Sequence, residues 1–237
     1  MPVKAVLFDM FDTLMLIEKN HEFYIPSLMR AHEVLVKNGL DVRFPIFLDA
    51  YVKARNALYE KANKRLEEPH FNMRIVNALR ILGYFGIESE VIAEATTAFC
   101  EEFMKYVRID DDAKSILEKF HRKYKLGVVS NFAIPECVEK LLETHGLDSF
   151  LDVIVVSATV NKRKPSPEIF QAAVADLGVD KEKVVFVGDS PKADIEGAKS
   201  FGMKTIYLER REQNMGKVSP DQVVKSLAEL TVALAEF

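Results

Sequence analysis

Short apolar segments that alternate with amphipathic ones form the main pattern along this chain. Five segments consist almost entirely of apolar side chains, at residues 3–8, 126–130, 153–157, 184–187 and 205–208. Runs that are continuous rather than alternating predict strands buried on both faces of a sheet. Between most of them, apolar residues at helix spacing predict helices at 113–124, 135–145, 167–177 and 194–201. This alternation predicts an α/β fold with a parallel, Rossmann-like sheet and right-handed crossovers.

Residues 16–107 follow a different pattern, with almost no strand signal. Apolar positions at helix spacing predict four helices there, the third closed by Gly83 and the fourth capped by Ser89. A helical block inserted after the first strand is in effect a second domain. We therefore expect a core domain formed by residues 1–15 and 108–237, and an inserted α-helical domain formed by residues 16–107.

The composition restricts the class of protein. The chain has 237 residues, of which 49% are hydrophobic, so it can bury a sizeable core. A net charge of -4 gives no argument for nucleic acid or an anionic membrane as a partner, and no apolar stretch approaches the length of a spanning helix. The isolated Cys100 and Cys137 fit a reducing compartment. We expect a cytoplasmic protein that is a monomer or a homodimer and acts on a small molecule.

Polar residues follow the predicted strands at the points where the strands end. Asp9 follows the first strand, Ser130 and Asn131 the second, Lys164 the third and Asp189 the fourth. The carboxyl ends of parallel strands meet at one edge of a sheet, which is where ligands bind in open α/β folds. We therefore expect these side chains to converge on a single site.

The carboxylates of this set favour a metal ion. Asp9 and Asp189 are expected to converge, with Asp194 five residues further on. Like charges packed together repel each other unless a cation neutralises them, and hard oxygen ligands favour Mg²⁺. A Mg²⁺ ion would attract a phosphate group and offset the charge that develops in phosphoryl transfer.

The remaining polar residues suit a phosphate group. Lys164 would add a fixed positive charge, and Thr13 and Ser130 would donate hydrogen bonds to the phosphate oxygens. Asp9 would then attack phosphorus in line, and water would hydrolyse the resulting aspartyl-phosphate. These residues predict a hydrolase of phosphoesters.

Four motifs in this order resemble those of the haloacid dehalogenase (HAD) superfamily. They read FDMFDTL at 8–14, VVSN at 128–131, KPSPEIF at 164–170 and FVGDSPKADIEGA at 186–198. The resemblance covers the core, about residues 1–15 and 108–208. The four helices before residue 107 look like the helical cap that this family inserts after the first motif.

The resemblance implies a role for each matched position. Asp9 looks like the nucleophile, and Mg²⁺ would be held by Asp9, Asp189 and the backbone carbonyl of Phe11, with Asp194 supporting the ion through water. The residues that would bind or orient the transferring group are Thr13, Ser130, Asn131 and Lys164. The cap would close over the site, exclude water and select a small phosphorylated metabolite.

Phe11 departs from the usual phosphatase pattern, in which this position is a second aspartate that serves as the general acid and base. Phenylalanine cannot transfer a proton, and the loss of a positioned acid typically lowers the rate by about 10²–10⁴-fold. Asp12 is adjacent, but alternate residues of an extended segment point to opposite sides. We expect Asp12 to cap the local loop rather than to replace the acid.

Two other functions remain open at this stage. The 2-haloacid dehalogenases of the family have an aromatic residue at the position of Phe11, and a halide leaving group needs no proton. However, they replace the metal-binding aspartate of the fourth motif, whereas this chain keeps Asp189 and Asp194. The third possibility is a weakly active or non-catalytic relative that binds a phosphorylated partner.

Specificity is expected to lie in the cap, where His21 and Arg55 are polar candidates for substrate contact. Lys162 and Arg163 lie next to Lys164 in a polar loop, and we interpret both as solvent-exposed charge.

Overall fold

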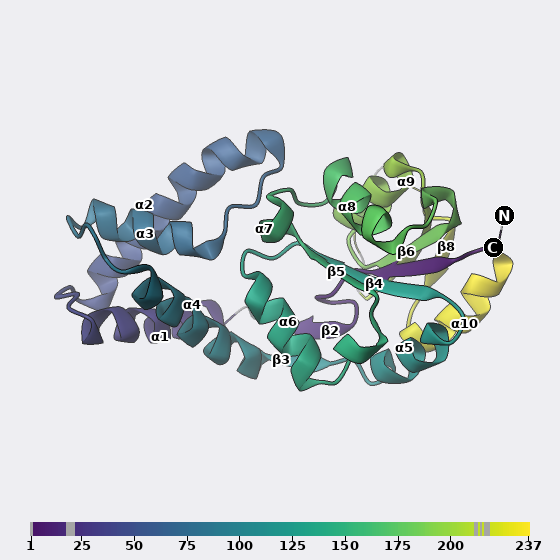
Figure 1. Ribbon diagram of the computed structural model, residues 1–237, viewed down its shortest axis with the longest axis horizontal. Helices are drawn as coiled ribbons and strands as arrows, with labels where there is room; N and C mark the ends of the chain where they lie inside the picture. Colours follow the sequence, from purple (N-terminus) through teal and green to yellow (C-terminus); the bar gives the residue numbers. More distant parts are fainter. Residues whose placement is uncertain (1, 18–21, 211–212, 214, 216–218) are drawn as a thin grey trace.

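A six-stranded parallel sheet forms the centre of the fold (Figure 1). The computed structural model describes residues 2–17, 22–210, 213, 215 and 219–237. The strands lie in the order β5-β4-β1-β6-β7-β8. They are β1 (Ala5–Phe8), β4 (Lys125–Ser130), β5 (Val153–Val156), β6 (Val184–Gly188), β7 (Lys204–Leu208) and β8 (Gln222–Val224). The predicted α/β class and the five predicted strands are confirmed, and β8 is an additional short strand.

Both faces of this sheet are buried, which explains the continuous apolar runs. Val6 and Phe8 of β1 belong to one apolar cluster, whereas Ala5 and Leu7 belong to a second cluster. Successive side chains of a strand point to opposite faces, so each residue of β1 enters a different core. Because neither face is solvated, no polar residue is needed within the strand.

The helices of the core connect consecutive strands, except the last one, which follows β8. They are α5 (Ala113–His121), α6 (Pro135–Thr144), α7 (Ser157–Val160), α8 (Pro167–Leu177), α9 (Gly197–Phe201) and α10 (Leu230–Ala233). The predicted helix at 167–177 agrees with α8, which ends at Gly178 in the left-handed conformation with φ +62°. The predicted helix at 194–201 is instead a π-helical turn (Pro191–Glu196) followed by α9, and Ser190 caps the turn by accepting a hydrogen bond from the backbone of Ala193.

Four α-helices lie between β1 and α5 in the described chain, to one side of the sheet (Figure 1). They are α1 (Tyr24–Lys37), α2 (Phe44–Ala62), α3 (Phe71–Ile81) and α4 (Ser89–Phe103). We call them the four-helix insertion. Helix α1 packs against α4, and α2 packs against α3. The prediction that Ser89 caps the fourth helix is wrong, because Glu88 holds the N-cap position and the Ser89 hydroxyl bonds to Glu90.

A two-stranded antiparallel ribbon joins the insertion to the core. Strand β2 (Met15–Ile17) leads out of the core, and β3 (Val107–Ile109) leads back to it. The two segments that connect the insertion to the core are therefore hydrogen-bonded to each other. This ribbon was not expected from the sequence, since three-residue strands carry too few positions to show a period.

Candidate active site

Asp9 lies at the carboxyl end of the central strand of the sheet. Strand β1 is flanked by β4 on one side and β6 on the other, and the backbone N–H of Asp9 donates to the carbonyl of Val187 at 2.9 Å. The residues at the carboxyl ends of β4 and β6, which include Ser130 and Asp189, therefore lie at the same edge of the sheet as Asp9. The parallel topology therefore brings the segments that carry the predicted site residues to one edge of the sheet.

The Asp9 carboxylate is buried and engaged by two side chains. Its Oδ2 atom accepts a hydrogen bond from the Thr13 hydroxyl at 3.1 Å, and its Oδ1 atom lies 2.6 Å from Lys164 Nζ. The same ammonium lies 2.7 Å from Oδ1 of Asp194, which is also buried. Lys164 thus connects two of the three aspartates that the sequence placed at this edge.

The third aspartate completes a group of three carboxylates. Oxygen atoms of Asp9, Asp189 and Asp194 all lie within 4.8 Å of one another. Asp194 is held by a hydrogen bond of 2.9 Å from the backbone N–H of Ser190 to its Oδ2 atom. Gly188 permits this arrangement, since a Cβ atom at that position would overlap the Asp194 carboxylate.

The electrostatics of this group suit a divalent cation. With all groups ionised, three carboxylates and the Lys164 ammonium leave two negative charges in excess. Burial raises the pKa of Asp9 to about 6, against the opposing influence of Lys164. Burial lowers the pKa of Lys164, but the carboxylates of Asp194 and Asp9 outweigh it and hold that pKa above its usual value. Three hard oxygen donors at this spacing fit Mg²⁺.

Ser130 is the last residue of β4 and Asn131 follows it, and their side chains take different roles. The Ser130 hydroxyl is buried and has no hydrogen-bond partner in the part of the chain that the structure describes. Asn131 accepts from the backbone N–H of Lys164 at 2.7 Å and donates to its carbonyl at 3.0 Å. Asn131 therefore positions Lys164, whereas the Ser130 hydroxyl stays without a partner among the described residues.

Phe11 takes part in an aromatic cluster rather than in the polar group. Its ring centroid lies 4.9 Å from that of Phe132, in the loop after β4, and 5.7 Å from that of Phe103 in α4. The neighbouring Asp12 has a φ of +59° and accepts a hydrogen bond from the backbone N–H of Ile17 at 3.4 Å. The Asp12 side chain thus stabilises its own loop, as the sequence indicated. The role of the Phe11 carbonyl as a metal ligand stays a prediction.

Arg210 is a residue that the sequence did not single out. It follows β7 and donates hydrogen bonds to the carbonyls of Asp12 and Thr13, at 3.2 and 2.8 Å. It also forms an ion pair of 2.7 Å with Asp110. Arg210 therefore stabilises the conformation of the loop that follows Asp9. Its place after the fifth predicted strand, at the same edge of the sheet, is the signal that would have identified it.

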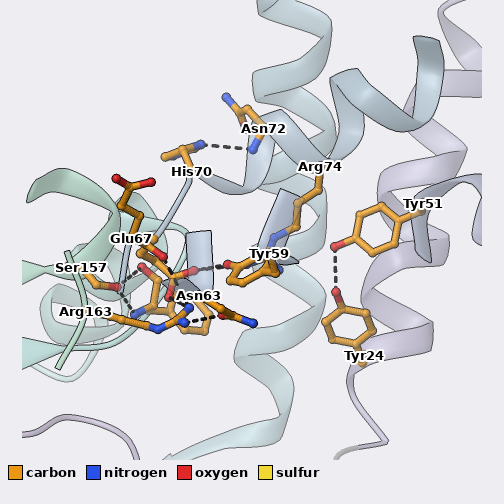
Figure 2. A network of polar contacts seen from close by, with 12 residues as sticks. Tyr24, Tyr51, Tyr59, Asn63, Glu67, His70, Asn72, Arg74, Ser157 and Arg163 are labelled. Atoms are coloured by element: carbon orange, nitrogen blue, oxygen red, sulfur yellow. Dashed lines mark hydrogen bonds and ion pairs between the residues drawn. The ribbon is translucent and has the colours of Figure 1, made fainter. Parts of the chain in front are cut away.

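Lys162 and Arg163 were interpreted as solvent-exposed charge, and that interpretation is wrong. Lys162 Nζ donates to the carbonyl of Arg65 at 3.0 Å. The Arg163 backbone N–H donates to the carbonyl of Leu66 at 2.8 Å, and its guanidinium contacts residues 63 and 67 (Figure 2). The loop that carries Lys164 is therefore attached to the segment between α2 and α3. The sequence could not reveal these contacts, because the partners lie about a hundred positions away.

The comparisons with known proteins agree with this geometry. Residues 3–202 match the family model of the haloacid dehalogenase-like hydrolases, so the chain belongs to this family and is a hydrolase. The glyceraldehyde 3-phosphate phosphatase of Methanopyrus kandleri is 29% identical over 229 residues, which cover 93% of this chain and 91% of that protein.

Two solved structures share the fold along nearly the whole chain. A 2-haloacid dehalogenase from Pseudomonas syringae is 23% identical, with a TM-score of 0.73 and 99% of both chains covered. A HAD phosphatase from Thermococcus onnurineus is 26% identical, with a TM-score of 0.64 and 98% of both chains covered. In the part of the chain that the structure describes, no helix is both long and apolar enough to span a membrane. His21 lies outside the described residues.

Proposed function

We propose that this chain is a Mg²⁺-dependent phosphatase of small phosphorylated metabolites. The observation that carries the proposal is the convergence of the Asp9, Asp189 and Asp194 carboxylates at the end of the central strands, where Lys164 pairs with Asp9 and Asp194. Hydrolysis of a carbon–halogen bond or of a carboxylic ester does not require an excess of negative charge beside the nucleophile. Phosphoryl transfer assisted by a divalent cation does, because the carboxylates bind that cation. The relatives named as glyceraldehyde 3-phosphate phosphatases support the same chemistry.

Asp9 is the nucleophile in this proposal. One carboxylate oxygen bonds to phosphorus as the bond from phosphorus to the leaving oxygen breaks, which gives an aspartyl-phosphate. Water then attacks phosphorus, releases phosphate and restores the Asp9 carboxylate. Thr13 and Lys164 orient that carboxylate through the contacts of 3.1 and 2.6 Å described above. Lys164 also adds positive charge to the transferring phosphoryl group.

The metal site comprises Asp9, Asp189 and the backbone carbonyl of Phe11, with Asp194 in support. A bound Mg²⁺ supplies charge neutralisation and polarises the phosphoryl oxygens. Burial raises the pKa of Asp9 to about 6, and the Asp194 carboxylate acts in the same direction, whereas Lys164 lowers that pKa. The buried Ser130 hydroxyl, which has no partner among the described residues, would donate to a phosphoryl oxygen.

The four-helix insertion serves as a cap over this site in the proposal. The chain would divide into a core at residues 1–15 and 108–237 and a cap at residues 16–107. The aromatic contacts of Phe11 with Phe132 and Phe103 support this view, because they join the catalytic loop to α4 and cover it with apolar rings. Exclusion of water by such a cover strengthens the electrostatic interactions within the site.

The rival function is hydrolysis of 2-haloacids. Phe11 favours it, because a halide leaves without a proton and an aromatic ring in place of an acid does not impede that reaction. Asp189 and Asp194 oppose it, since they add negative charge beside an Asp9 that would have to attack an anionic haloacid. The two functions therefore make opposite predictions for the role of a divalent cation.

The deciding experiment compares two substrates with and without metal. We expect the purified protein to release phosphate from 4-nitrophenyl phosphate with Mg²⁺ and to lose this activity with a chelator. We expect no halide release from 2-chloropropionate under either condition. Asp9→Asn should abolish phosphate release, whereas Asp12→Asn, which removes a neighbouring carboxylate, should retain it. Halide release in the presence of chelator would replace the phosphatase proposal with the dehalogenase, and the absence of both activities would indicate a binding protein.

A further inference from the structure

A pocket of about 240 Å³ lies between the four-helix insertion and the loop after β4. Aromatic side chains from α1, α2, α3 and α4 line its walls, and residues 131–134 line its other side. Asn131 belongs both to this lining and to the hydrogen bonds that position Lys164. The pocket therefore adjoins the loop that presents Lys164 to Asp9. A volume of this size suits a small group of atoms rather than a large ligand.

Arg74 of α3 lines this pocket with a buried guanidinium. It donates to the Tyr59 hydroxyl, lies 3.5 Å from Glu68, and sits 4.9 Å above the Tyr59 ring (Figure 2). Its Nε atom is buried and has no hydrogen-bond partner among the residues that the structure describes. A buried N–H donor without an acceptor is unfavourable, so an anionic group beside this guanidinium would offset part of that cost.

The charges around the pocket do not balance. Glu68 is shared between Arg74 and Arg163, whose guanidinium lies 4.0 Å from the second oxygen of the same carboxylate. Arg55 of α2 also lines the pocket and lies 5.9 Å from the Tyr24 ring centroid. Two guanidinium groups, those of Arg74 and Arg163, thus share the Glu68 carboxylate, and Arg55 adds an exposed positive charge at the pocket. The low exposure of Arg74 strengthens its part of this positive potential, which favours an anionic group.

We infer that this pocket binds a second anionic group, carried by the leaving group of the phosphoester, and that Arg74 is the residue that recognises it. The inference rests on the proposed function, because it places the reacting phosphate at Asp9 and the rest of the substrate in the pocket. The substrate class is then a small phosphate ester that bears a carboxylate or a second phosphate. A neutral leaving group, such as a hydroxyaldehyde, would leave the Arg74 Nε without an acceptor and the positive charge uncompensated.

A matched series of three-carbon substrates tests this inference. The series comprises n-propyl phosphate, 3-phosphonooxypropanoate and propane-1,3-diyl bisphosphate, which share a primary alkoxide leaving group. We expect kcat/KM to be at least about tenfold higher for one of the charged esters than for n-propyl phosphate, since a hydrogen bond to a charged group contributes about that factor. The carboxylate and bisphosphate members identify which anion the pocket prefers. Equal kcat/KM for all three would overturn the inference.

Variants of Arg74 test the assignment of the residue. The ratio of kcat/KM between the charged and neutral esters should fall toward one in Arg74→Met. Arg74→Met leaves the negative charge of the buried Glu68 with less positive charge beside it, which can destabilise the fold. The double variant Arg74→Met with Glu68→Gln removes both charges and keeps the site neutral. Arg80→Met is the matched control, as Arg80 lies on the same helix but is exposed, and it should keep the wild-type ratio. A ratio that survives in the double variant would overturn the role of Arg74.

A binding measurement separates this inference from the proposed function. Calorimetric titration of the Asp9→Asn protein with 3-phosphonooxypropanoate, propane-1,3-diyl bisphosphate and n-propyl phosphate requires no turnover. We expect at least one charged ester to bind about tenfold or more tightly than n-propyl phosphate, and the difference to vanish when Arg74→Met is added. A protein that shows this difference in affinity but hydrolyses none of the esters would contradict the proposed phosphatase activity and leave the anion-binding pocket supported. A protein that hydrolyses all the esters but binds them with equal affinity would contradict the anion-binding role of the pocket and leave the phosphatase activity supported.

Discussion

Lys164 Nζ lies 2.7 Å from Asp194 Oδ1, and both side chains are almost fully buried. The same ammonium lies 2.6 Å from the Asp9 carboxylate, so one positive charge separates the two acids. A third acid, Asp189, brings its carboxylate to within 4.8 Å of both aspartates. The lysine therefore neutralises part of the acidic cluster and leaves the remainder for a divalent cation and the incoming phosphoryl group.

Replacement of Lys164 should affect both catalysis and stability. We expect Lys164→Met to lower kcat/KM for an aryl phosphate by at least about 10²-fold, because it removes positive charge from the transferring group. Without metal, it should also lower the free energy of unfolding by about 3–5 kcal/mol, because two buried carboxylates lose their partner. Urea denaturation with and without Mg²⁺ measures the second effect. An unchanged free energy of unfolding in the metal-free variant would contradict the geometry.

Binding of Mg²⁺ should depend on pH through Asp9. The pKa of Asp9 in the metal-free folded protein is about 6, raised by burial above its value of 3.8 in the unfolded chain. The protonated group therefore contributes stability below about pH 4, and this contribution is lost as the pH rises through about 6. A divalent cation restores stability above that pH, when Asp9 is ionised.

Thermal melts over about pH 5 to 8 test this dependence. Saturating Mg²⁺ should raise the Tm at neutral pH, and the increase should shrink as the pH falls through about 6. In Asp9→Asn, the increase should be smaller and lose this step. A constant increase over the whole range would show that Asp9 does not ligate the ion.

Phe11→Asp should alter the reaction according to the leaving group. An acid at this position would protonate an alkoxide, whereas a nitrophenoxide leaves without help. We expect the turnover of alkyl phosphates to rise relative to that of aryl phosphates. The Tm should fall, because the ring contacts with Phe132 and Phe103 are lost. Phe11→Leu controls for that loss of packing, and a ratio of alkyl to aryl turnover equal in both variants would refute the missing-acid argument.

Arg210 offers a test of the loop that carries the nucleophile. Arg210→Met removes two hydrogen bonds to the backbone of Asp12 and Thr13 and leaves the buried Asp110 without its ion pair. We expect the free energy of unfolding to fall by about 1–3 kcal/mol and kcat to fall by about tenfold. Adding Asp110→Asn should recover stability but not kcat. Full recovery of kcat in the double variant would show that Arg210 acts through Asp110 alone.

The sequence predicted those parts of the molecule that depend on local pattern. The five continuous apolar runs correspond to β1, β4, β5, β6 and β7, since a strand buried on both faces admits few polar residues. Asp9, Lys164 and Asp194 were found by their place after these strands, and the parallel topology brings them together.

The remaining features depend on distant partners. Arg163 and Arg210 were missed because their charge is compensated by segments far away in the chain, at residues 63–68 and 110. Polar residues in such loops look the same in sequence whether they are solvated or buried. The pocket around Arg74 was hidden for a similar reason, since its walls come from four helices whose packing no local pattern reveals.

The most direct test of the central claim is to trap the covalent intermediate. The protein is mixed with excess 4-nitrophenyl phosphate and Mg²⁺, quenched in acid on the millisecond scale, and the peptide containing residue 9 is analysed by mass spectrometry. We expect a transient gain of one phosphoryl group on Asp9, which disappears as turnover ends and never forms with chelator present. Rapid release of nitrophenol with no phosphoryl group on Asp9 at any time point would contradict the account.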